Sequence, residues 1–179
     1  MSETPMTRNG VQLHLTSVVA GGEQAFREDE ASRQARVGNV ASVRRFLELL
    51  ELPDIETWLM LWAEESQQEM PYAPPGFPGL FESKARIAEQ FRALPATYEF
   101  MRYPDLEIFE TQDPKVVIAT FRGEIKLANS DRRYDNRYVN FFVFDDSGKL
   151  MRVVEHFNPL VLTQGGAFGE GGRPLGAGE

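Results

Sequence analysis

Near Pro95 the sequence changes from helical periodicity to a series of strand-like segments. Apolar residues recur at helical spacing in three segments, at 37–50, 54–65 and 82–94, and a short strand is expected at 67–72. Segments rich in β-branched and aromatic residues follow at 97–103, 106–111, 115–128, 134–144 and 149–157. Helices followed by strands indicate an α+β fold, with three N-terminal helices packed on one face of an antiparallel sheet.

The two ends of the chain lack this patterning. Residues 1–36 show no sustained period, and six glycines fall within 165–176. We therefore expect a flexible N-terminal arm over 1–36 and a flexible glycine-rich tail over 164–179. The residues between them, 37–163, are expected to form a single domain, whose last two strands are joined by turn residues at 145–148.

Composition and charge exclude several classes of function. The chain has 27 acidic and 19 basic side chains and a net charge of −8, which disfavours nucleic acid and anionic membranes as partners. It has no cysteine, so disulfides, thiol nucleophiles and zinc–sulfur sites are ruled out. The two histidines, His14 and His156, are too few for a multi-histidine metal centre.

Sequence motifs add further exclusions. No apolar run approaches the roughly 18 residues of a membrane-spanning helix. No dinucleotide fingerprint, phosphate loop or serine elbow is present. We therefore expect a cytoplasmic protein without a cofactor or a metal ion.

A carboxylate stands out in the strand expected at 149–157. Side chains alternate between the two faces of a strand, so Glu155 shares a face with Met151, Val153 and Phe157. A carboxylate among apolar neighbours has a raised pKa, as a general base that removes a proton beside a carbonyl requires. Two alternatives remain open at this point: an ion pair with an arginine, or exposure at the rim of the sheet.

The neighbouring strand, 134–144, carries polar and aromatic groups on one face. Tyr134, Asn136 and Tyr138 lie on this face, where they could donate hydrogen bonds to a ligand oxygen or serve a purely structural role. The other face, which includes Val139 and Phe141, is also largely apolar. Since both faces need cover, we expect helices on one and a second copy of the chain on the other, giving a homodimer through the sheet; another protein partner is the weaker alternative.

The segment from Tyr134 to Pro159, which reads YDNRYVNFFVFDDSGKLMRVVEHFNP, resembles the closing hairpin of SnoaL-like proteins in the nuclear-transport-factor-2-like superfamily. It is most similar to the phenazine biosynthesis A/B proteins, and the likeness covers roughly residues 38–160. The resemblance implies a cone in which a strongly curved, mixed or antiparallel sheet is wrapped by three helices around an internal pocket. It also implies a dimer and acid–base chemistry at Glu155, with Tyr134 at the position of a site tyrosine. These relatives have a histidine near the start of the third helix, where this chain has Ser83 and Lys84.

These observations predict a cofactor-independent isomerase, cyclase or dehydratase that acts on a hydrophobic carbonyl metabolite. Glu155 would move the proton, and Tyr134, with Asn136 or Tyr138, would stabilise the developing oxyanion. The residues expected to bind the substrate are Trp62, Tyr72, Lys84, Phe91, Asn136, Tyr138, Met151, Val153 and Phe157. The alternative is a non-catalytic ligand-binding or assembly module that has the same fold.

Overall fold

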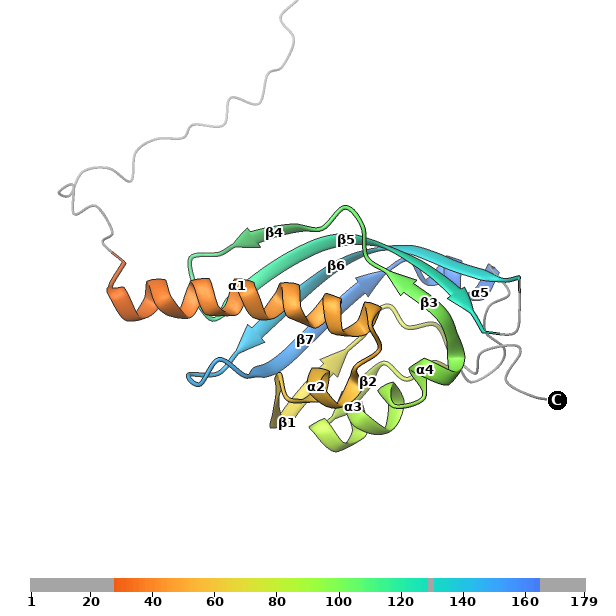
Figure 1. The fold of residues 1–179 in the computed structure, drawn as a ribbon, viewed down its shortest axis with the longest axis horizontal. Helices are drawn as coiled ribbons and strands as arrows, with labels where there is room; N and C mark the ends of the chain where they lie inside the picture. Colours follow the sequence, from red (N-terminus) through yellow and green to blue (C-terminus); the bar gives the residue numbers. More distant parts are fainter. Residues whose placement is uncertain (1–27, 129–130, 165–179) are drawn as a thin grey trace, which may run out of the picture.

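The computed structural model describes residues 28–128 and 131–164 (Figure 1). Its helices and strands are α1 (Glu30–Glu51), α2 (Ile55–Leu59), β1 (Trp62–Glu69), β2 (Leu80–Glu82), α3 (Lys84–Phe91), α4 (Leu94–Thr97), β3 (Tyr98–Arg102), β4 (Glu107–Glu110), β5 (Val116–Leu127), β6 (Arg133–Phe144), β7 (Leu150–Phe157) and α5 (Pro159–Gln164). Helix α1 begins at Glu30, so residues 30–36 of the expected arm are helical. The rest of that arm up to residue 27, and residues 165–179 of the expected tail, lie outside the described residues.

A single curved sheet forms the body of the molecule. Its strand order is β2-β1-β7-β6-β5-β3, and β4 also pairs with β5. Strands β1 and β7 run parallel, whereas every other pair is antiparallel, so the sheet is mixed. Helix α1 lies across one face, and α2, α3 and α4 gather at the β1–β2 end (Figure 1). The predicted fold class, helices packed on a strongly curved sheet, is confirmed.

The prediction of a helix over 54–65 was wrong in its second half. Helix α2 ends at Leu59, and β1 begins at Trp62. Trp62 pairs with Leu150 and Gln68 pairs with Val153 in the parallel β1–β7 ladder. Because the ladder satisfies the backbone groups of this segment, tertiary pairing overrides its helical periodicity.

The third predicted helix, 82–94, is divided in the structure. Strand β2 occupies 80–82, and the helical residues fall into α3 and α4. Ser83 separates β2 from α3 at a φ of 89°, and its hydroxyl oxygen accepts a hydrogen bond from the Arg86 backbone N–H at 3.4 Å. It therefore serves as the N-cap of α3.

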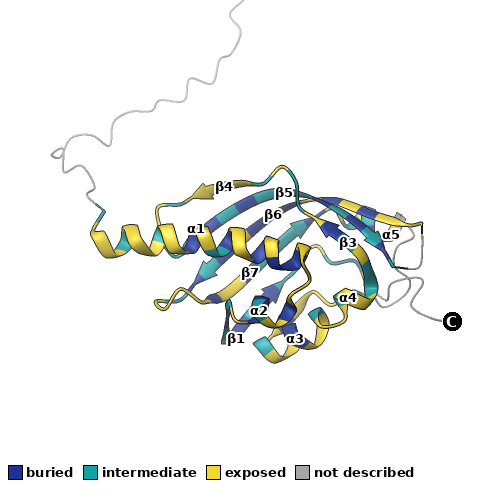
Figure 2. Cartoon of the chain, in the orientation of Figure 1, coloured by how far each residue is buried: buried dark blue, intermediate teal, exposed yellow. Residues whose placement is uncertain are grey.

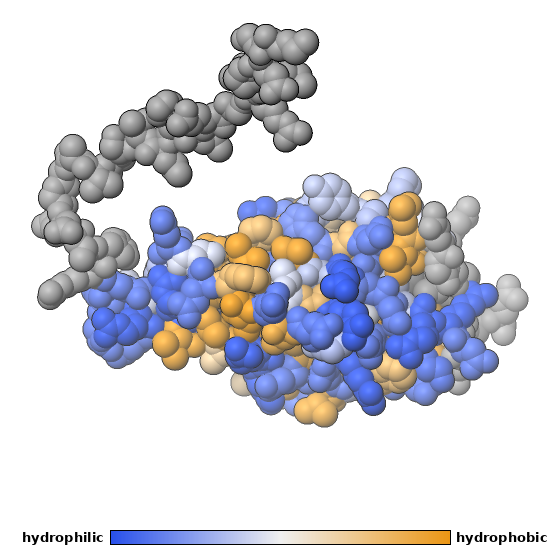
Figure 3. All heavy atoms as spheres, turned by 90° about the horizontal axis from the view of Figure 1, so that it is seen from above, coloured by the Kyte–Doolittle hydropathy of each residue, from blue (hydrophilic) through white to orange (hydrophobic). Residues whose placement is uncertain are grey.

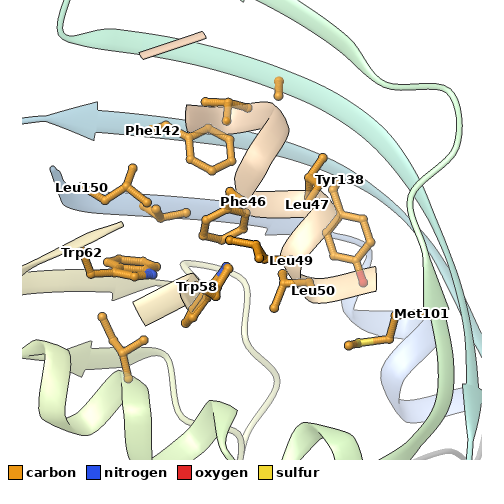
Figure 4. Packing of buried hydrophobic residues seen from close by; sticks show 14 of the residues in the cluster. Phe46, Leu47, Leu49, Leu50, Trp58, Trp62, Met101, Tyr138, Phe142 and Leu150 are labelled. Carbon is orange, nitrogen blue, oxygen red and sulfur yellow. The ribbon is translucent and has the colours of Figure 1, made fainter. Parts of the chain in front are cut away.

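An aromatic cluster fixes α1 on the sheet (Figure 4), and the second half of α1 carries buried residues (Figure 2). The Phe46 ring of α1 lies 5.0 Å from Trp58, 6.0 Å from Trp62 and 5.2 Å from Phe142, measured between ring centroids. All four side chains are buried. Asn39, also buried, adds a hydrogen bond of 2.9 Å from its side-chain amide to the Pro114 carbonyl. These contacts set the distance between α1 and the strands that face it.

A β-bulge changes the side-chain alternation at the start of β7. Phe144 pairs with Leu150 and Val143 pairs with Arg152, which leaves Met151 as the extra residue. Leu150 and Val153 are therefore both buried, whereas Met151 is 38% exposed. The prediction that Met151 lies on the face of Val153 and Glu155 was wrong because alternation alone does not reveal a bulge.

The outer face of the sheet carries a row of apolar residues that crosses four strands. Phe109 pairs with Ile118, Ile118 with Phe141, and Phe141 with Val154. Phe109 and Phe141 are exposed, and the other two are half-buried. Figure 3 shows another view of the described surface, in which apolar residues lie among hydrophilic ones. No helix in the described part of the chain is long and apolar enough to cross a membrane.

Substitution of Gly123 tests how closely the sheet packs on one of its tyrosines. A Cβ at this buried position of β5 would lie 2.8 Å from Cε2 of Tyr138, whose ring is held by stacking on Phe121. We expect Gly123→Ala to lower the free energy of unfolding in urea by about 1–3 kcal/mol through overpacking. The matched control is Gly38→Ala in α1, where no atom of the described residues outside the helix backbone lies within 4 Å of the new Cβ and a gain of about 0.5–1 kcal/mol is expected. Equal or greater stability of Gly123→Ala would contradict this packing.

Candidate functional site

A cavity of about 350 Å³ lies between α1 and the inner face of the sheet. Side chains of α1, α3, β1, β3, β5, β6 and β7 contribute to its wall, and most of these side chains are apolar. In Figure 4, Tyr138 and Met101 lie on the side of Phe46 and Trp58 away from Trp62. The densely packed aromatic cluster thus ends where the cavity begins.

Glu155 of β7 is the ionisable carboxyl in the cavity wall. The residue is half-buried, and protein atoms surround its carboxyl group closely. Desolvation raises the pKa of Glu155 to about 7, and a polar contact from Asn140 acts in the opposite direction. Among the described residues, no lysine, arginine or histidine forms an ion pair with Glu155. The structure therefore has neither the arginine pair nor the rim exposure that the sequence left open.

Tyr134 and Tyr138 also border the cavity, and a network that includes Asn136 holds Tyr134. The Asn136 amide nitrogen donates to the Tyr134 hydroxyl oxygen at 3.1 Å and to the Asn158 carbonyl at 3.0 Å. The Asn136 side-chain oxygen accepts from the Asn158 backbone N–H at 3.1 Å. Asn136 is buried and does not line the cavity, so the structure favours a positioning role for it over contact with a ligand.

Two further tyrosines, Tyr98 and Tyr103, were missed by the sequence reasoning. Tyr98 begins β3, Tyr103 follows that strand, and both border the cavity. Burial raises the pKa of each of these phenols, and the negative charge of Glu155 adds to the effect. Burial likewise raises the pKa of Tyr134 to about 12 and that of Tyr138 well above its usual range. The phenols therefore stay protonated at neutral pH and can donate hydrogen bonds.

Two buried amides in the cavity wall have hydrogen-bonding capacity that the described residues do not fully use. The Asn140 amide interacts with Glu155 but makes no hydrogen bond of normal geometry, and the Gln68 side-chain oxygen has no partner among the described residues. The two residues are 1% and 2% exposed. Asn140 pairs directly with Glu155 across the β6–β7 ladder, and Gln68 lies on β1, the next strand beyond β7. Glu155 thus has a polar residue on each neighbouring strand.

The remaining predicted site residues divide between the wall and other places. Phe91 and Phe157 line the cavity, whereas Val153 is buried behind its surface. The placement of Trp62 in the wall was wrong because it belongs to the aromatic cluster, 5.2 Å from Trp58. Met151 faces outward because of the bulge.

Tyr72 and Lys84 also lie away from the cavity. Tyr72 is 60% exposed, and its ring lies 5.6 Å from that of His156, on the opposite side of β7 from Glu155. Lys84 forms an ion pair of 2.8 Å with Glu64 at a separate surface depression. The hydrophobic pattern of the sequence could not reveal that these residues lie outside the cavity, because Tyr72 is next to a loop and Lys84 is at the start of α3. Within the described ranges, no group of three histidine or acidic side chains is placed to hold a metal ion.

Comparisons with known proteins agree with this geometry. The sequence is 32% identical over 114 residues to the uncharacterised PhzA/B-like protein PA3332 of Pseudomonas aeruginosa, covering 64% of this chain and 79% of that protein. The crystal structure of a putative isomerase from Bacillus subtilis has a TM-score of 0.68 and 25% identity, covering 73% of this chain and 94% of that one. A putative polyketide cyclase from Xanthomonas campestris pv. campestris has a TM-score of 0.58 and 18% identity, covering 71% and 93%, and so shares the fold. The SnoaL-like domain family model matches residues 43–153. This chain therefore belongs to the SnoaL-like family, as the resemblance of its closing hairpin predicts.

Proposed function

We propose that the protein is a cofactor-independent isomerase, cyclase or dehydratase in which Glu155 moves a proton on a hydrophobic carbonyl ligand. The observation that carries this proposal is the position of Glu155 in the cavity wall without a cationic partner in the described residues. A carboxyl group with a pKa of about 7 exists in both protonation states at neutral pH. It can therefore remove a proton from carbon and return it at another position, as these reactions require.

The tyrosines supply the second part of the proposed chemistry. When a proton leaves the carbon beside a carbonyl, negative charge develops on the carbonyl oxygen, and neutral donors in a dry site stabilise it. Tyr134 and Tyr138 are the proposed donors, with Tyr98 and Tyr103 also within the wall. Asn136 is proposed to act through Tyr134, since its amide donates to that hydroxyl oxygen. The isomerase and cyclase descriptions of two structural neighbours fit the same class of chemistry.

Hydrogen–deuterium exchange at an enolisable ketone tests proton removal without requiring the natural substrate. We expect the protein to accelerate exchange of the α-protons of 2-tetralone in D₂O, followed by NMR, and Glu155→Gln to lower that rate by about 10²- to 10⁴-fold. Because the ionised carboxylate is the base, the rate should rise with pH through about 7 and then level off. The Gln variant should lose this inflection.

The matched control for this experiment is Glu82→Gln, which changes an exposed carboxylate on β2 outside the cavity. Its exchange rate and pH profile should equal those of the wild type. If Glu155→Gln exchanges as fast as the wild type, Glu155 is not the base. If the wild type gives no acceleration of 2-tetralone or of comparable bicyclic ketones, the non-catalytic binding module becomes the better account.

We also propose that two copies of the chain pair through the outer face of the sheet. The apolar row of Phe109, Ile118, Phe141 and Val154 supports this, because an exposed row across four strands needs cover in water. An outer sheet face that both copies present identically suits a two-fold interface.

Light scattering after size-exclusion chromatography tests this pairing. The wild type is expected at twice the 20.3 kDa chain mass. Phe141→Glu places a charge in the middle of the row and should shift the mass to that of one chain. Leu52→Glu, an exposed apolar residue at the end of α1, should leave the dimer intact. A monomeric wild type at tens of micromolar would contradict the proposal.

A further inference from the structure

The cavity wall carries an unusual balance of charge. Of the described residues that line it, none is a lysine, arginine or histidine, and Glu155 is its carboxylate. Two cations on elements of the wall form ion pairs elsewhere: Arg152 of β7 pairs with Glu69 at 2.6 Å, and Lys84, at the start of α3, pairs with Glu64. A ligand that enters with a negative charge would lose its hydration, meet no counter-ion in this wall and lie near Glu155. Each of these effects opposes binding of an anion.

The polar part of the wall has hydrogen-bonding capacity that the protein does not use. Asn140 and Gln68 are almost fully buried. Among the described residues, the Gln68 side-chain oxygen has no partner, and the Asn140 amide interacts with Glu155 without a hydrogen bond of normal geometry. A buried polar atom without a partner costs about 1–3 kcal/mol, which a ligand recovers when it supplies the missing bond. Because an amide carries both a donor and an acceptor, the complementary ligand group also carries both.

The sheet places these amides in one polar row. Asn140, Glu155 and Gln68 belong to β6, β7 and β1, which are consecutive in the sheet. Asn140 is the direct pairing partner of Glu155, and Gln68 pairs with Val153, which is two residues from Glu155. The rest of the wall is mainly aromatic and aliphatic, and the volume of about 350 Å³ suits a ligand of two or three rings.

Building on the proposed function, we infer that the cavity selects an uncharged aromatic or polycyclic ligand whose donor–acceptor group pairs with Asn140 and Gln68, and that it excludes carboxylic acids. Because the inference concerns ligand recognition, binding measurements test it and turnover measurements do not. It assigns Asn140 and Gln68 as specificity-determining residues. It also accounts for an otherwise costly arrangement, since apolar side chains at these two positions would pack without unpaired atoms.

Three probes of matched shape test the charge selectivity. Naphthalene-2-carboxamide is neutral, 2-naphthoate is an anion and naphthalene-2-carboxamidine is a cation, and all three carry the same bicyclic ring. Isothermal titration at pH 8, where Glu155 is mostly ionised, measures the affinity of each probe. The carboxamide is expected to bind at least 10-fold more tightly than the naphthoate. It is also expected to bind more tightly than the amidine, whose group has donors but no acceptor for the Asn140 and Gln68 amides. Glu155→Gln should reduce the penalty for the naphthoate.

Variants of Asn140 and Gln68 test whether these residues recognise the ligand. Asn140→Leu and Gln68→Leu should each weaken carboxamide binding about 5- to 20-fold, the loss of one or two hydrogen bonds, while affinity for unsubstituted naphthalene stays within twofold. The matched control is Ser66→Ala on β1, because its hydroxyl is also buried and has no partner among the described residues but does not line the cavity. This variant should bind all probes like the wild type. Since naphthalene binding reports an intact cavity, a variant that misfolds is recognised by the loss of both ligands.

Several outcomes would overturn the inference. One is naphthoate affinity equal to that of the carboxamide, and another is no measurable carboxamide binding up to its solubility limit. Tightest binding of the amidine would identify an amine site, with the ligand as the missing counter-ion of Glu155. Full carboxamide affinity in both leucine variants would remove Asn140 and Gln68 from recognition. If the protein does not accelerate ketone exchange but still prefers the carboxamide, only the proposed catalysis is contradicted. The two proposals can therefore fail separately.

Discussion

Burial of the Glu155 carboxyl without a counter-ion governs the chemistry available to this cavity. An ionised carboxylate removed from water is costly, and the described residues offer it no cation. The protein meets this cost by raising the pKa of Glu155 to about 7, so that the neutral form is populated near physiological pH. The lack of positive charge makes the carboxyl a candidate proton carrier. It also disfavours the binding of acidic ligands in the cavity. Catalytic competence and ligand charge are thus two consequences of one electrostatic arrangement.

The fold supports that arrangement by packing tightly on one side and leaving space on the other. Phe46 anchors α1 on Trp58, Trp62 and Phe142, which leaves no room for a ligand at that end. Toward the other end, the sheet curves away, and the tyrosines border the hollow instead of filling it. Gly123 allows the Tyr138 ring to approach the backbone of β5 closely. The donors are therefore held by packed neighbours, as a preorganised site requires.

Much of the fold and part of the candidate site were predictable from the sequence, because one face of each long strand is buried. Strict alternation in β6 placed Tyr134, Asn136 and Tyr138 on one inner face, and the closing hairpin identified the family. The wrong placements arose where long-range pairing decides the local structure. Trp62 has helical spacing but joins a parallel ladder, and Met151 follows the alternation until a bulge reverses it. Tyr98, Tyr103 and Gln68 come from separate segments, so only the assembled sheet brings them to Glu155.

Direct titration of the Glu155 carboxyl is the sharpest test of the central claim. Carbon-13 NMR of glutamate-labelled protein follows each carboxyl with pH, and the resonance absent from Glu155→Gln assigns the relevant one. The account predicts a midpoint near 7 for this group. A midpoint near its usual value of 4.5 would show that water or an unrecognised cation stabilises the charge, and it would contradict the account.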